Sequence, residues 1–320
     1  MNEIIKRYKK LAIIFSVMAV VLIVAHFILE AAFYPYANAS LLVVGGIIAV
    51  AAAVCWILYG IEIKKIKEKQ RADRQLEEKF GEWLKEFEPF TKTAAELICI
   101  DGDRKGFSKF GGLPIVPDNF EWPTLNGNPI PFVLQLDFSE INSDGRLKSF
   151  PASGLLYLFI EEAFEPEFDY IPKILFFDKA SKLSCANVPN NLQKKYMEFF
   201  VEPNYIKVYP DVSDCDEAFK ILCNRPCGGM DDEYNALSEK NVESHLVGGW
   251  PSHLQGSFEK ICEEIDGDKW VLLLQIKSES SQNFDEELMW GDCGLLYIYI
   301  REKDLITRNF NNVILEMQCY

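Results

Sequence analysis

Two histidines give the sequence its best opportunity for acid–base chemistry. His245 and His253 flank the segment Gly248-Gly249-Trp250-Pro251, and Asp292 follows further along the chain. An imidazole beside a carboxylate can act as a general acid or base. No Gly-x-Ser-x-Gly motif, which would supply a nucleophile, accompanies them. A histidine beside a turn more often satisfies local hydrogen bonds, so we expect no catalytic residues and favour a protein that is not an enzyme.

The cysteines do not form a metal-binding pattern. Cys223 and Cys227 could join Cys215 and His245 around zinc, but their spacing is not Cys-x-x-Cys and no second pair follows in the sequence. The 9 cysteines are an odd number without framework spacing, which is typical of a reducing cytoplasm. The sequence also has no P-loop, no Gly-x-Gly-x-x-Gly and no EF-hand loop. We therefore predict no metal and no cofactor.

An internal repeat relates two parts of the sequence. Three segments recur in the same order: Ser108–Pro114 and His245–Pro251, Phe132–Leu136 and Leu272–Ile276, and Gly154–Ile160 and Gly294–Ile300. The interval from Gln135 to Gly154 equals that from Gln275 to Gly294. Three matches in one order predict a duplication, with pseudo-symmetric repeats at about 108–160 and 245–300.

Each repeat predicts the same local structure. Gly-Gly-x-Pro predicts a turn, because glycine permits positive φ and proline fixes the next backbone step. An apolar strand with one central glutamine follows, and then a strand of alternating leucine and aromatic residues. Further strands are expected at 173–177 and 206–209, and helices at 214–222 and 257–265. The predicted class is α+β, with mixed or antiparallel sheets plus helices.

Gln135 and Gln275 each lie in a wholly apolar run. A buried amide needs partners, because an unsatisfied one costs about 1–3 kcal/mol. We expect the two glutamines to pair with turns of the opposite half, the favoured structural role, or to line a cleft shared by the repeats. Glycine would let a ligand approach the backbone of such a cleft. The candidate binding residues are Gly111, Gly112, Pro114, Gln135, His245, Gly248, Gly249, Gln255, Gln275, Trp290 and Asp292.

The repeated motifs resemble those of a known family. The segments Gly111-Gly112-x-Pro114-x-x-Pro117, Trp122-Pro123 and Leu134-Gln135 resemble the front half of the YwqG-like family, a bacterial domain of unknown function. Its back half is matched by Gly248-Gly249-x-Pro251 with Gln255, Leu274-Gln275, Met289-Trp290-Gly291-Asp292-x-Gly294, Asp304-Leu305, Phe310 and Gln318-Cys319-Tyr320. The resemblance covers about residues 95–320. Relatives often carry an acid where this chain has Lys277, whereas the first half keeps Asp137.

This resemblance implies a fold class and a setting, with no established activity. It implies an α+β domain in a bacterial cytoplasm. Some relatives occur near toxin and immunity genes, which by analogy suggests an immunity-like role.

The charge is divided unevenly along the chain. Residues 1–74 carry a net +5 and the whole chain −15, which leaves −20 for residues 75–320. Such a surface repels phosphate backbones and anionic headgroups, so we expect no nucleic-acid partner. A basic protein would suit it, although solubility alone also explains an acidic surface.

Two apolar runs predict a transmembrane hairpin within residues 1–63. Leu11–Leu29 and Leu41–Ile61 contain no Asp, Glu, Lys or Arg, and at 1.5 Å per residue each can cross a core of about 30 Å. Lysine and arginine flank the hairpin on both outer sides, while the loop 30–40 has none. This places both termini and the main domain in the cytoplasm, at the bacterial inner membrane. A cleaved signal peptide ending near Ala37-Asn38-Ala39 is the alternative.

The second apolar run carries small residues at every fourth position. Gly45, Ala49 and Ala53 would let a neighbouring helix pack closely. That neighbour is either the first run or, in a homo-oligomer, a second copy of the chain.

A charged amphipathic helix at residues 64–90 is expected to connect the hairpin to the domain at 91–320. One face holds apolar residues at helical spacing: Leu76, Phe80, Trp83, Leu84 and Phe87. We expect this face to dock onto the domain. A helix lying on the membrane is the alternative, but the glutamates in the later half of this segment suit anionic lipid poorly.

Two functional hypotheses follow from these observations. The first is a membrane-anchored, non-enzymatic and acidic protein-interaction module, for which the family analogy given above suggests an immunity-like role. The second is an enzyme or small-molecule binder that uses the cleft between the repeats. The charge of the domain and the missing catalytic motif favour the first hypothesis.

Overall fold

The computed structural model of this chain contains two compact units. They comprise Met1–Gly81 and Glu82–Tyr320. The structure describes residues 13–18, 20–21, 23–24, 39–100, 106–161, 172–178, 182–211, 213–223, 231–241, 244–257, 266–281 and 286–319.

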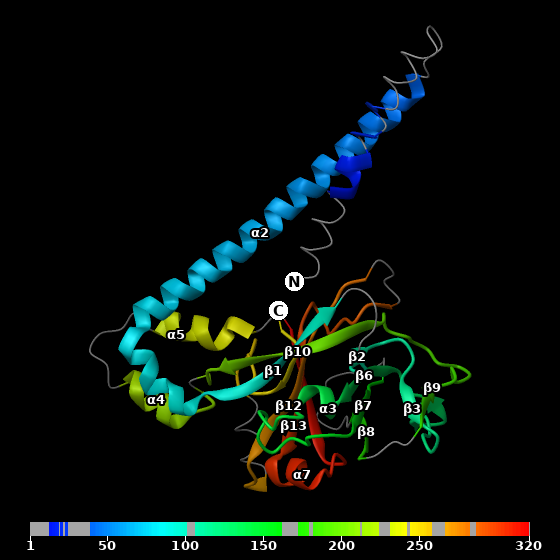
Figure 1. Ribbon diagram of the computed structural model, residues 1–320. Helices are drawn as coiled ribbons and strands as arrows, with labels where there is room; N and C mark the ends of the chain where they lie inside the picture. Colours follow the sequence, from blue (N-terminus) through cyan, green and yellow to red (C-terminus); the bar gives the residue numbers. More distant parts are fainter. Residues whose placement is uncertain are drawn as a thin grey trace. The chain divides into compact units, whose positions relative to one another are not determined.

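One long helix makes up most of the described first unit. Helix α2 (Ala39–Phe87) has 49 residues and continues past the boundary between the units (Figure 1). In the part of the chain that the structure describes, one segment, Gly46–Ala72, is long and apolar enough to cross a membrane. The first predicted span is described only as the helical residues 13–18, 20–21 and 23–24. Among the described residues there is therefore one apolar helix of spanning length rather than a clear two-helix hairpin.

The buried face of α2 differs from the predicted small-residue face. Ala52 is buried, whereas Ala49 and Ala53 are exposed. Four residues beyond Ala52, the indole Nε1 of Trp56 donates a hydrogen bond to the hydroxyl of Ser16, at 3.4 Å. The described contact between the two apolar runs therefore involves the Ala52–Trp56 side of α2. The burial of Gly45 lies outside the described features.

The second unit is built around one sheet of ten antiparallel strands, in the order β14-β13-β12-β11-β1-β10-β2-β6-β7-β8. These strands are β1 (Lys92–Ile100), β2 (Lys109–Phe110), β6 (Phe132–Asp137), β7 (Leu155–Phe159), β8 (Lys173–Phe177), β10 (Phe199–Val208), β11 (Leu246–Gly248), β12 (Trp270–Lys277), β13 (Leu295–Arg301) and β14 (Val313–Gln318). Two small sheets pair β3 (Ile115–Pro117) with β9 (Leu183–Cys185), and β4 (Thr124–Leu125) with β5 (Asn128–Pro129). The helices of this unit are η1 (Glu88–Phe90), α3 (Phe138–Ile141), α4 (Asp216–Cys223), α5 (Asp231–Ser238), η2 (Glu239–Asn241) and α7 (Glu302–Thr307).

The order of the strands is mirrored about the centre of the sheet. Strands β2, β6, β7 and β8 lie on one side, and β11, β12, β13 and β14 lie in the corresponding places on the other. The long central pair is β1 and β10. Strand β1 also pairs with β11, and β10 also pairs with β2. Strand β1 is thus hydrogen-bonded to the half that follows β10 in the chain, and β10 is hydrogen-bonded to the half that follows β1.

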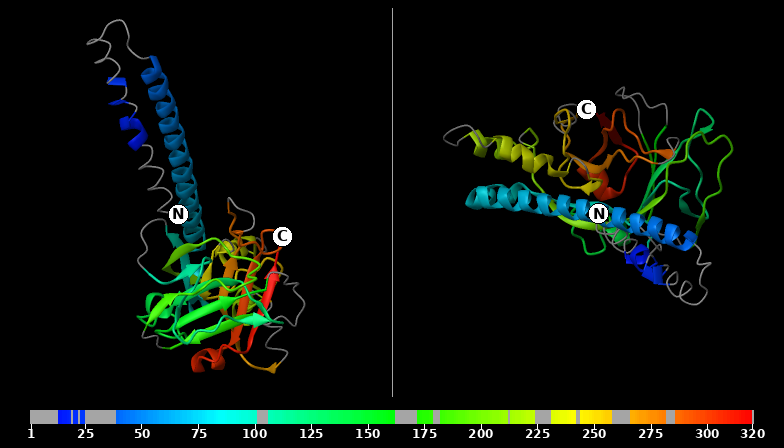
Figure 2. Two further views of the ribbon diagram at one scale, coloured as in Figure 1. Left: turned by 90° about the vertical axis from the view of Figure 1, so that its right-hand side faces the viewer. Right: turned by 90° about the horizontal axis from the view of Figure 1, so that it is seen from above.

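The sheet is strongly curled, which brings its two edges together (Figures 1 and 2). Phe176 of edge strand β8 and Phe310, just before the opposite edge strand β14, have ring centroids 5.0 Å apart. Arg308 and Asp178 form an ion pair between the same two regions. The edges are therefore covered by contacts with one another.

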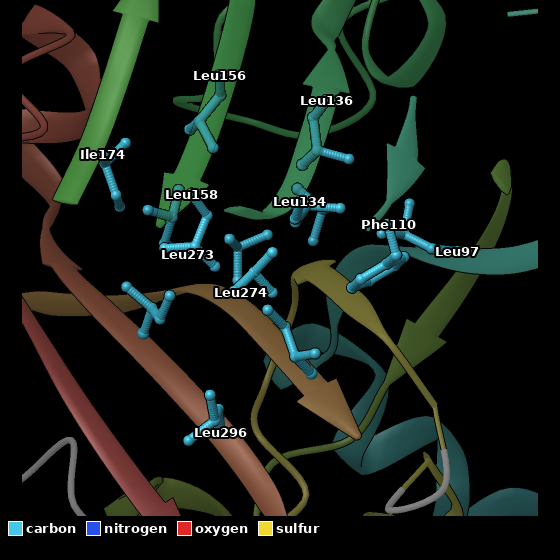
Figure 3. Close-up of a cluster of buried hydrophobic side chains, with 14 of the residues drawn as sticks. Leu97, Phe110, Leu134, Leu136, Leu156, Leu158, Ile174, Leu273, Leu274 and Leu296 are labelled. Atoms are coloured by element: carbon cyan, nitrogen blue, oxygen red, sulfur yellow. The ribbon is translucent and has the colours of Figure 1, made fainter. Parts of the chain in front are cut away.

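One apolar core fills the concave side of the sheet. It takes leucines from both halves, because alternate residues of the strands point inward, and at the register shifts in β6 and β12 two consecutive residues contribute. Figure 3 shows Leu134 and Leu158 of the first half pointing into the same space as Leu273 and Leu274 of the second. This shared core explains why neither half carries a separate one on that side.

The predicted elements are found in most of the described regions. Residues 173–177 form β8, 206–208 fall at the end of β10, which stops one residue short of the prediction, and 214–222 overlap α4. Most of the predicted helix 257–265 lies outside the described residues. Phe87, at the end of α2, is fully buried, and its ring lies 4.6 Å from that of Tyr234 in α5. The side chains of the rest of the predicted apolar face, Leu76, Phe80, Trp83 and Leu84, lie outside the described features.

Candidate functional site

Gln135 holds the Gly-Gly-x-Pro turn of the first half. Its Oε1 accepts a hydrogen bond from the N–H of Ile115 at 2.8 Å, and its Nε2 donates to the carbonyl of Phe107 at 3.0 Å. Ile115 directly follows the proline of the turn. Tyr157, the residue opposite Gln135 on β7, donates its hydroxyl to the carbonyl of Ile115 at 2.7 Å. A glutamine and a tyrosine therefore fix both backbone groups of Ile115.

Gln275 makes the same contacts in the second half. Its Oε1 accepts from the N–H of Ser252 at 2.9 Å, and its Nε2 donates to the carbonyl of Ser244 at 3.1 Å. Tyr297 lies opposite Gln275 and donates to the carbonyl of Ser252 at 2.7 Å. Each glutamine thus pairs with a turn of its own half, and not with the opposite half as predicted.

The two glutamines do not line a common cleft. Both are fully buried, and strands β11, β1, β10 and β2 lie between the strands that carry them. The glycines of the two turns are also explained by the backbone. Gly111 and Gly248 have φ of 55° and 68°, values that favour glycine. A Cβ on Gly111 would lie 2.0 Å from the carbonyl oxygen of Met197.

His245 forms a polar cluster at the end of the central strands. In the part of the chain that the structure describes, one group of possible metal ligands lies together: Cys99, His245 and Glu279, with ligand atoms within 4.8 Å of one another. The Nδ1 of His245 accepts from the backbone N–H of Lys277 at 3.2 Å. Its Nε2 lies 3.2 Å from the carboxylate of Glu279. Because Nδ1 is an acceptor, Nε2 carries the proton and donates to Glu279.

The protonation states of this cluster oppose nucleophilic catalysis. Burial raises the pKa of the Cys99 thiol to about 11, so the thiolate that would attack a substrate is scarce at neutral pH. Burial also lowers the pKa of His245, which favours the neutral ring. Burial alone would raise the pKa of Glu279, but hydrogen bonds from His245 and Lys277 outweigh it and lower that pKa to about 2.

The same cluster is poorly suited to a metal ion. The ammonium of Lys277 lies 2.7 Å from the carboxylate of Glu279 and already supplies its positive counter-charge. The one nitrogen of His245 that faces Glu279 is protonated, and the other accepts a backbone hydrogen bond. A metal would have to displace both interactions. The zinc ligands considered from the sequence are not assembled around His245 in the described chain, and Cys227 lies outside the described residues.

His253 belongs to a different cluster. Its Nε2 lies 3.0 Å from Asp214, whose side chain is fully buried, and Ser257 donates its hydroxyl to the same carboxylate. Burial lowers the pKa of His253, but the hydrogen bond to Asp214 and the nearby negative charges, including Glu316, outweigh it and raise that pKa. Burial raises the pKa of Glu316. The two histidines flank one turn, yet each contacts its own carboxylate and neither pairs with Asp292.

The other predicted site residues are dispersed. Trp290 is buried, with its ring centroid 6.1 Å from that of Tyr196, whereas Asp292 is exposed. Gln255 is exposed and donates to the carbonyl of Cys319 at 2.6 Å. The carbonyl of Pro114 accepts from the N–H of Ala186 at 2.9 Å, beside β9. These residues do not surround one cavity.

A cavity of about 280 Å³ lies elsewhere between the two halves. Its walls come from the start of β1, the loop 146–150 of the first half, and β12 and α7 of the second half. Of the predicted binding residues, Gly249 lines it. Sequence reasoning missed the others because the loop 146–150 carries no motif and meets β12 only through the curl of the sheet.

Comparison with protein families identifies most of the domain. A family model described as "Domain of unknown function (DUF1963)" matches residues 108–319. The comparison with curated proteins finds no match. The matched range is more than half of the chain and includes both Gly-Gly-x-Pro turns, both buried glutamines and the Trp290-Gly291-Asp292 segment. The chain therefore belongs to the DUF1963 family.

Proposed function

We propose that this protein is a membrane-anchored, non-enzymatic module whose acidic domain binds a basic protein on the cytoplasmic side. The observation that supports a membrane anchor is that apolar side chains of α2 are exposed. In the most apolar 18-residue window of Gly46–Ala72, only 6% of the residues are buried. Its large apolar side chains include Ile47, Val50 and Ile57, each more than 60% exposed. A contiguous apolar surface of this kind is costly in water and favourable in a bilayer.

The hairpin is the favoured form of this anchor. Helical residues of the first apolar run reach α2 through the contact between Ser16 and Trp56. Basic residues on both outer flanks favour cytoplasmic termini. The resemblance to the YwqG-like family supports the same bacterial cytoplasmic setting for the domain. Ala49 and Ala53 remain exposed on α2 and, with Gly45, are the proposed contact in a homo-oligomer.

The arrangement of the domain supports binding over catalysis. The mirrored strand order and the matched glutamine–tyrosine contacts are those expected of a duplicated fold, in which the repeated polar residues maintain turns. Burial raises the pKa of the Cys99 thiol and lowers the pKa of His245, which favours the protonated thiol and the neutral ring. The net charge of −20 on residues 75–320 then favours a basic protein partner.

The anchor can be tested in native membrane vesicles that contain the full chain. We expect the protein to remain in the membrane after a carbonate wash. Added protease should digest the domain in inside-out vesicles and spare it in right-side-out vesicles. Release by carbonate would contradict the anchor. A mature chain whose mass corresponds to cleavage near Ala39 would instead show that the first run is a signal peptide.

The partner can be tested by capture from the host cytoplasm on the full chain in non-ionic detergent. A basic protein should bind at low salt and be released as salt screens the charges. An unrelated acidic protein of matched net charge serves as the control bait. Equal capture by both baits would reduce the interaction to non-specific charge attraction and would reject the proposed module.

A further inference from the structure

One wall of the cavity between the halves is the loop 146–150, which is held in place by one buried side chain. Asn142 is 1% exposed and follows α3. Its Nδ2 lies within hydrogen-bonding distance of the carbonyls of Leu147, Phe150 and Pro151, at 3.0–3.2 Å. Its Oδ1 accepts from the N–H of Leu147 at 2.7 Å. The loop 146–150 is therefore held in place before any ligand arrives, which lowers the entropic cost of binding.

The same loop contains an unusual backbone conformation. Ser149 lines the cavity and has φ of 70°, a region that residues other than glycine rarely occupy. Strain of this kind tends to collect at ligand-binding segments. Its hydroxyl lies 3.4 Å from the carboxylate of Glu302 on α7, so the strained residue faces the wall contributed by the second half.

The cavity is basic although the domain is strongly acidic. Four cationic side chains line it, Lys92, Arg146, Lys148 and Lys269, against the single carboxylate of Glu302. Three of these side chains have nearby partners, since Lys269 lies 3.0 Å from Glu302, Arg146 lies 2.6 Å from Asp144, and the ammonium of Lys92 lies 3.2 Å from the centroid of the Trp250 ring.

Lys148 is the fourth of these cationic side chains, and its charge is not compensated by a described carboxylate. It is exposed at the rim, and among the residues that the structure describes none forms an ion pair with it. Thr91 and Thr93 also line the cavity, but the hydroxyl of Thr91 already donates to the carbonyl of Glu88 at 2.8 Å. An anionic group would thus find the uncompensated ammonium of Lys148 at the cavity.

The remaining surface of the cavity is apolar. Leu147 and Phe150 contribute from the first half, and Val271, Leu272 and Leu305 contribute from the second. The volume of about 280 Å³ lies just below the range of roughly 300–1,000 Å³ that is usual for ligand pockets. The ligand must therefore be small, with one anionic group and a compact apolar part.

We propose that this cavity binds a small amphipathic anion, a phosphate or carboxylate attached to an apolar group, with the anion at Lys148 and the apolar part against Val271. The site is independent of the acidic surface proposed for a basic partner. The chemistry fits both a soluble organic anion and the headgroup region of an anionic lipid, and the experiment below distinguishes these sources.

The test measures phenyl phosphate binding by calorimetry to the full chain in nanodiscs of phosphatidylcholine. Phenyl phosphate should bind at least about tenfold more tightly than inorganic phosphate, because the ring buries apolar surface. Lys148→Gln should weaken binding about fivefold, the effect of losing one exposed charged contact. Lys195→Gln removes an exposed lysine that does not line the cavity, and it should leave binding unchanged. Val271→Phe should fill the cavity and reduce binding more than tenfold.

Thermal unfolding of each variant without ligand shows whether it is folded, so a folding defect in Val271→Phe leaves the comparison of Lys148 with Lys195 decisive. Phosphatidylglycerol in the nanodisc should compete with phenyl phosphate if lipid is the natural source, and should leave binding unchanged if a soluble anion is. The proposal is overturned if phenyl phosphate binds no more tightly than inorganic phosphate, or if the Lys148 and Lys195 variants behave alike.

Discussion

His245 and Ser108 accept the same hydrogen bond in the two halves of the sheet. The N–H of Lys277 donates to Nδ1 of His245 at 3.2 Å, and the N–H of Asp137 donates to the hydroxyl of Ser108 at 3.0 Å. Each acceptor lies ahead of a Gly-Gly-x-Pro turn, and each donor lies two residues after the buried glutamine. The histidine therefore occupies a backbone-supporting position that a serine fills in the other half.

This equivalence predicts that His245→Asn is better tolerated than His245→Leu. Asparagine can still accept the hydrogen bond from Lys277, whereas leucine leaves that N–H without it. We expect the leucine variant to lose about 1–2 kcal/mol more of the free energy of unfolding than the asparagine variant. Urea denaturation of the full chain in non-ionic detergent measures the difference. Equal losses would show that the hydrogen bond is not what His245 contributes.

Gln275→Leu should destabilise the domain by about 2–4 kcal/mol. The substitution leaves the N–H of Ser252 and the carbonyl of Ser244 without the side-chain partners that now satisfy them. Gln193→Leu is the matched control, because Gln193 is exposed, and it should change stability by less than about 0.5 kcal/mol. The same urea titration compares the two variants. A Gln275 variant as stable as the control would contradict the role given to the buried glutamine.

Cys99 should react slowly with thiol reagents. Its pKa of about 11 keeps it protonated at neutral pH, and it is partly shielded, whereas Cys185 and Cys293 are exposed. We expect iodoacetamide at pH 7.5 to modify Cys99 more than about a hundredfold more slowly than these two cysteines, because the thiolate is the reactive form. Peptide mass spectrometry over time gives the rates. Modification of Cys99 at the rate of Cys185 would show that Cys99 is a thiolate, and would support a catalytic role for it.

The ion pair of His253 should make stability depend on pH. Its pKa is raised in the folded state relative to the ordinary value of 6.5, so its stabilising contribution is fully present below that value. The contribution is lost as the pH rises through the raised pKa. The difference in unfolding free energy between the wild-type protein and His253→Gln should therefore shrink from pH 6 to pH 9. A difference that stays constant over this range would mean that His253 does not titrate as a partner of Asp214.

Much of the fold follows from repeated local patterns. The Gly-Gly-x-Pro segments form turns with positive φ at Gly111 and Gly248, as their composition predicts. The apolar runs around Gln135 and Gln275 are buried strands, and residues 173–177 form β8. The sequence also indicated that a buried glutamine needs partners, although it placed those partners in the wrong half.

The positions of the candidate sites could not be predicted in the same way. Cys99 meets His245 because β1 pairs with β11, a strand almost 150 residues away in the chain. The cavity forms where the loop held by Asn142 meets β12, and no sequence motif marks that loop. Contacts of this kind depend on which strands become neighbours in a curled sheet, and local periodicity carries no information about that.

The pairing of β1 with β10 has a consequence for folding during synthesis on the ribosome. Lys92–Ile100 emerges from the ribosome about a hundred residues before Phe199–Val208, its neighbour on one side, and longer still before Leu246–Gly248 on the other. At a synthesis rate of roughly 5–20 residues per second, this strand waits for about 5–20 seconds with both edges unpaired. A chaperone that shields nascent strands would therefore be expected to bind this segment, which follows α2 and the short helix η1.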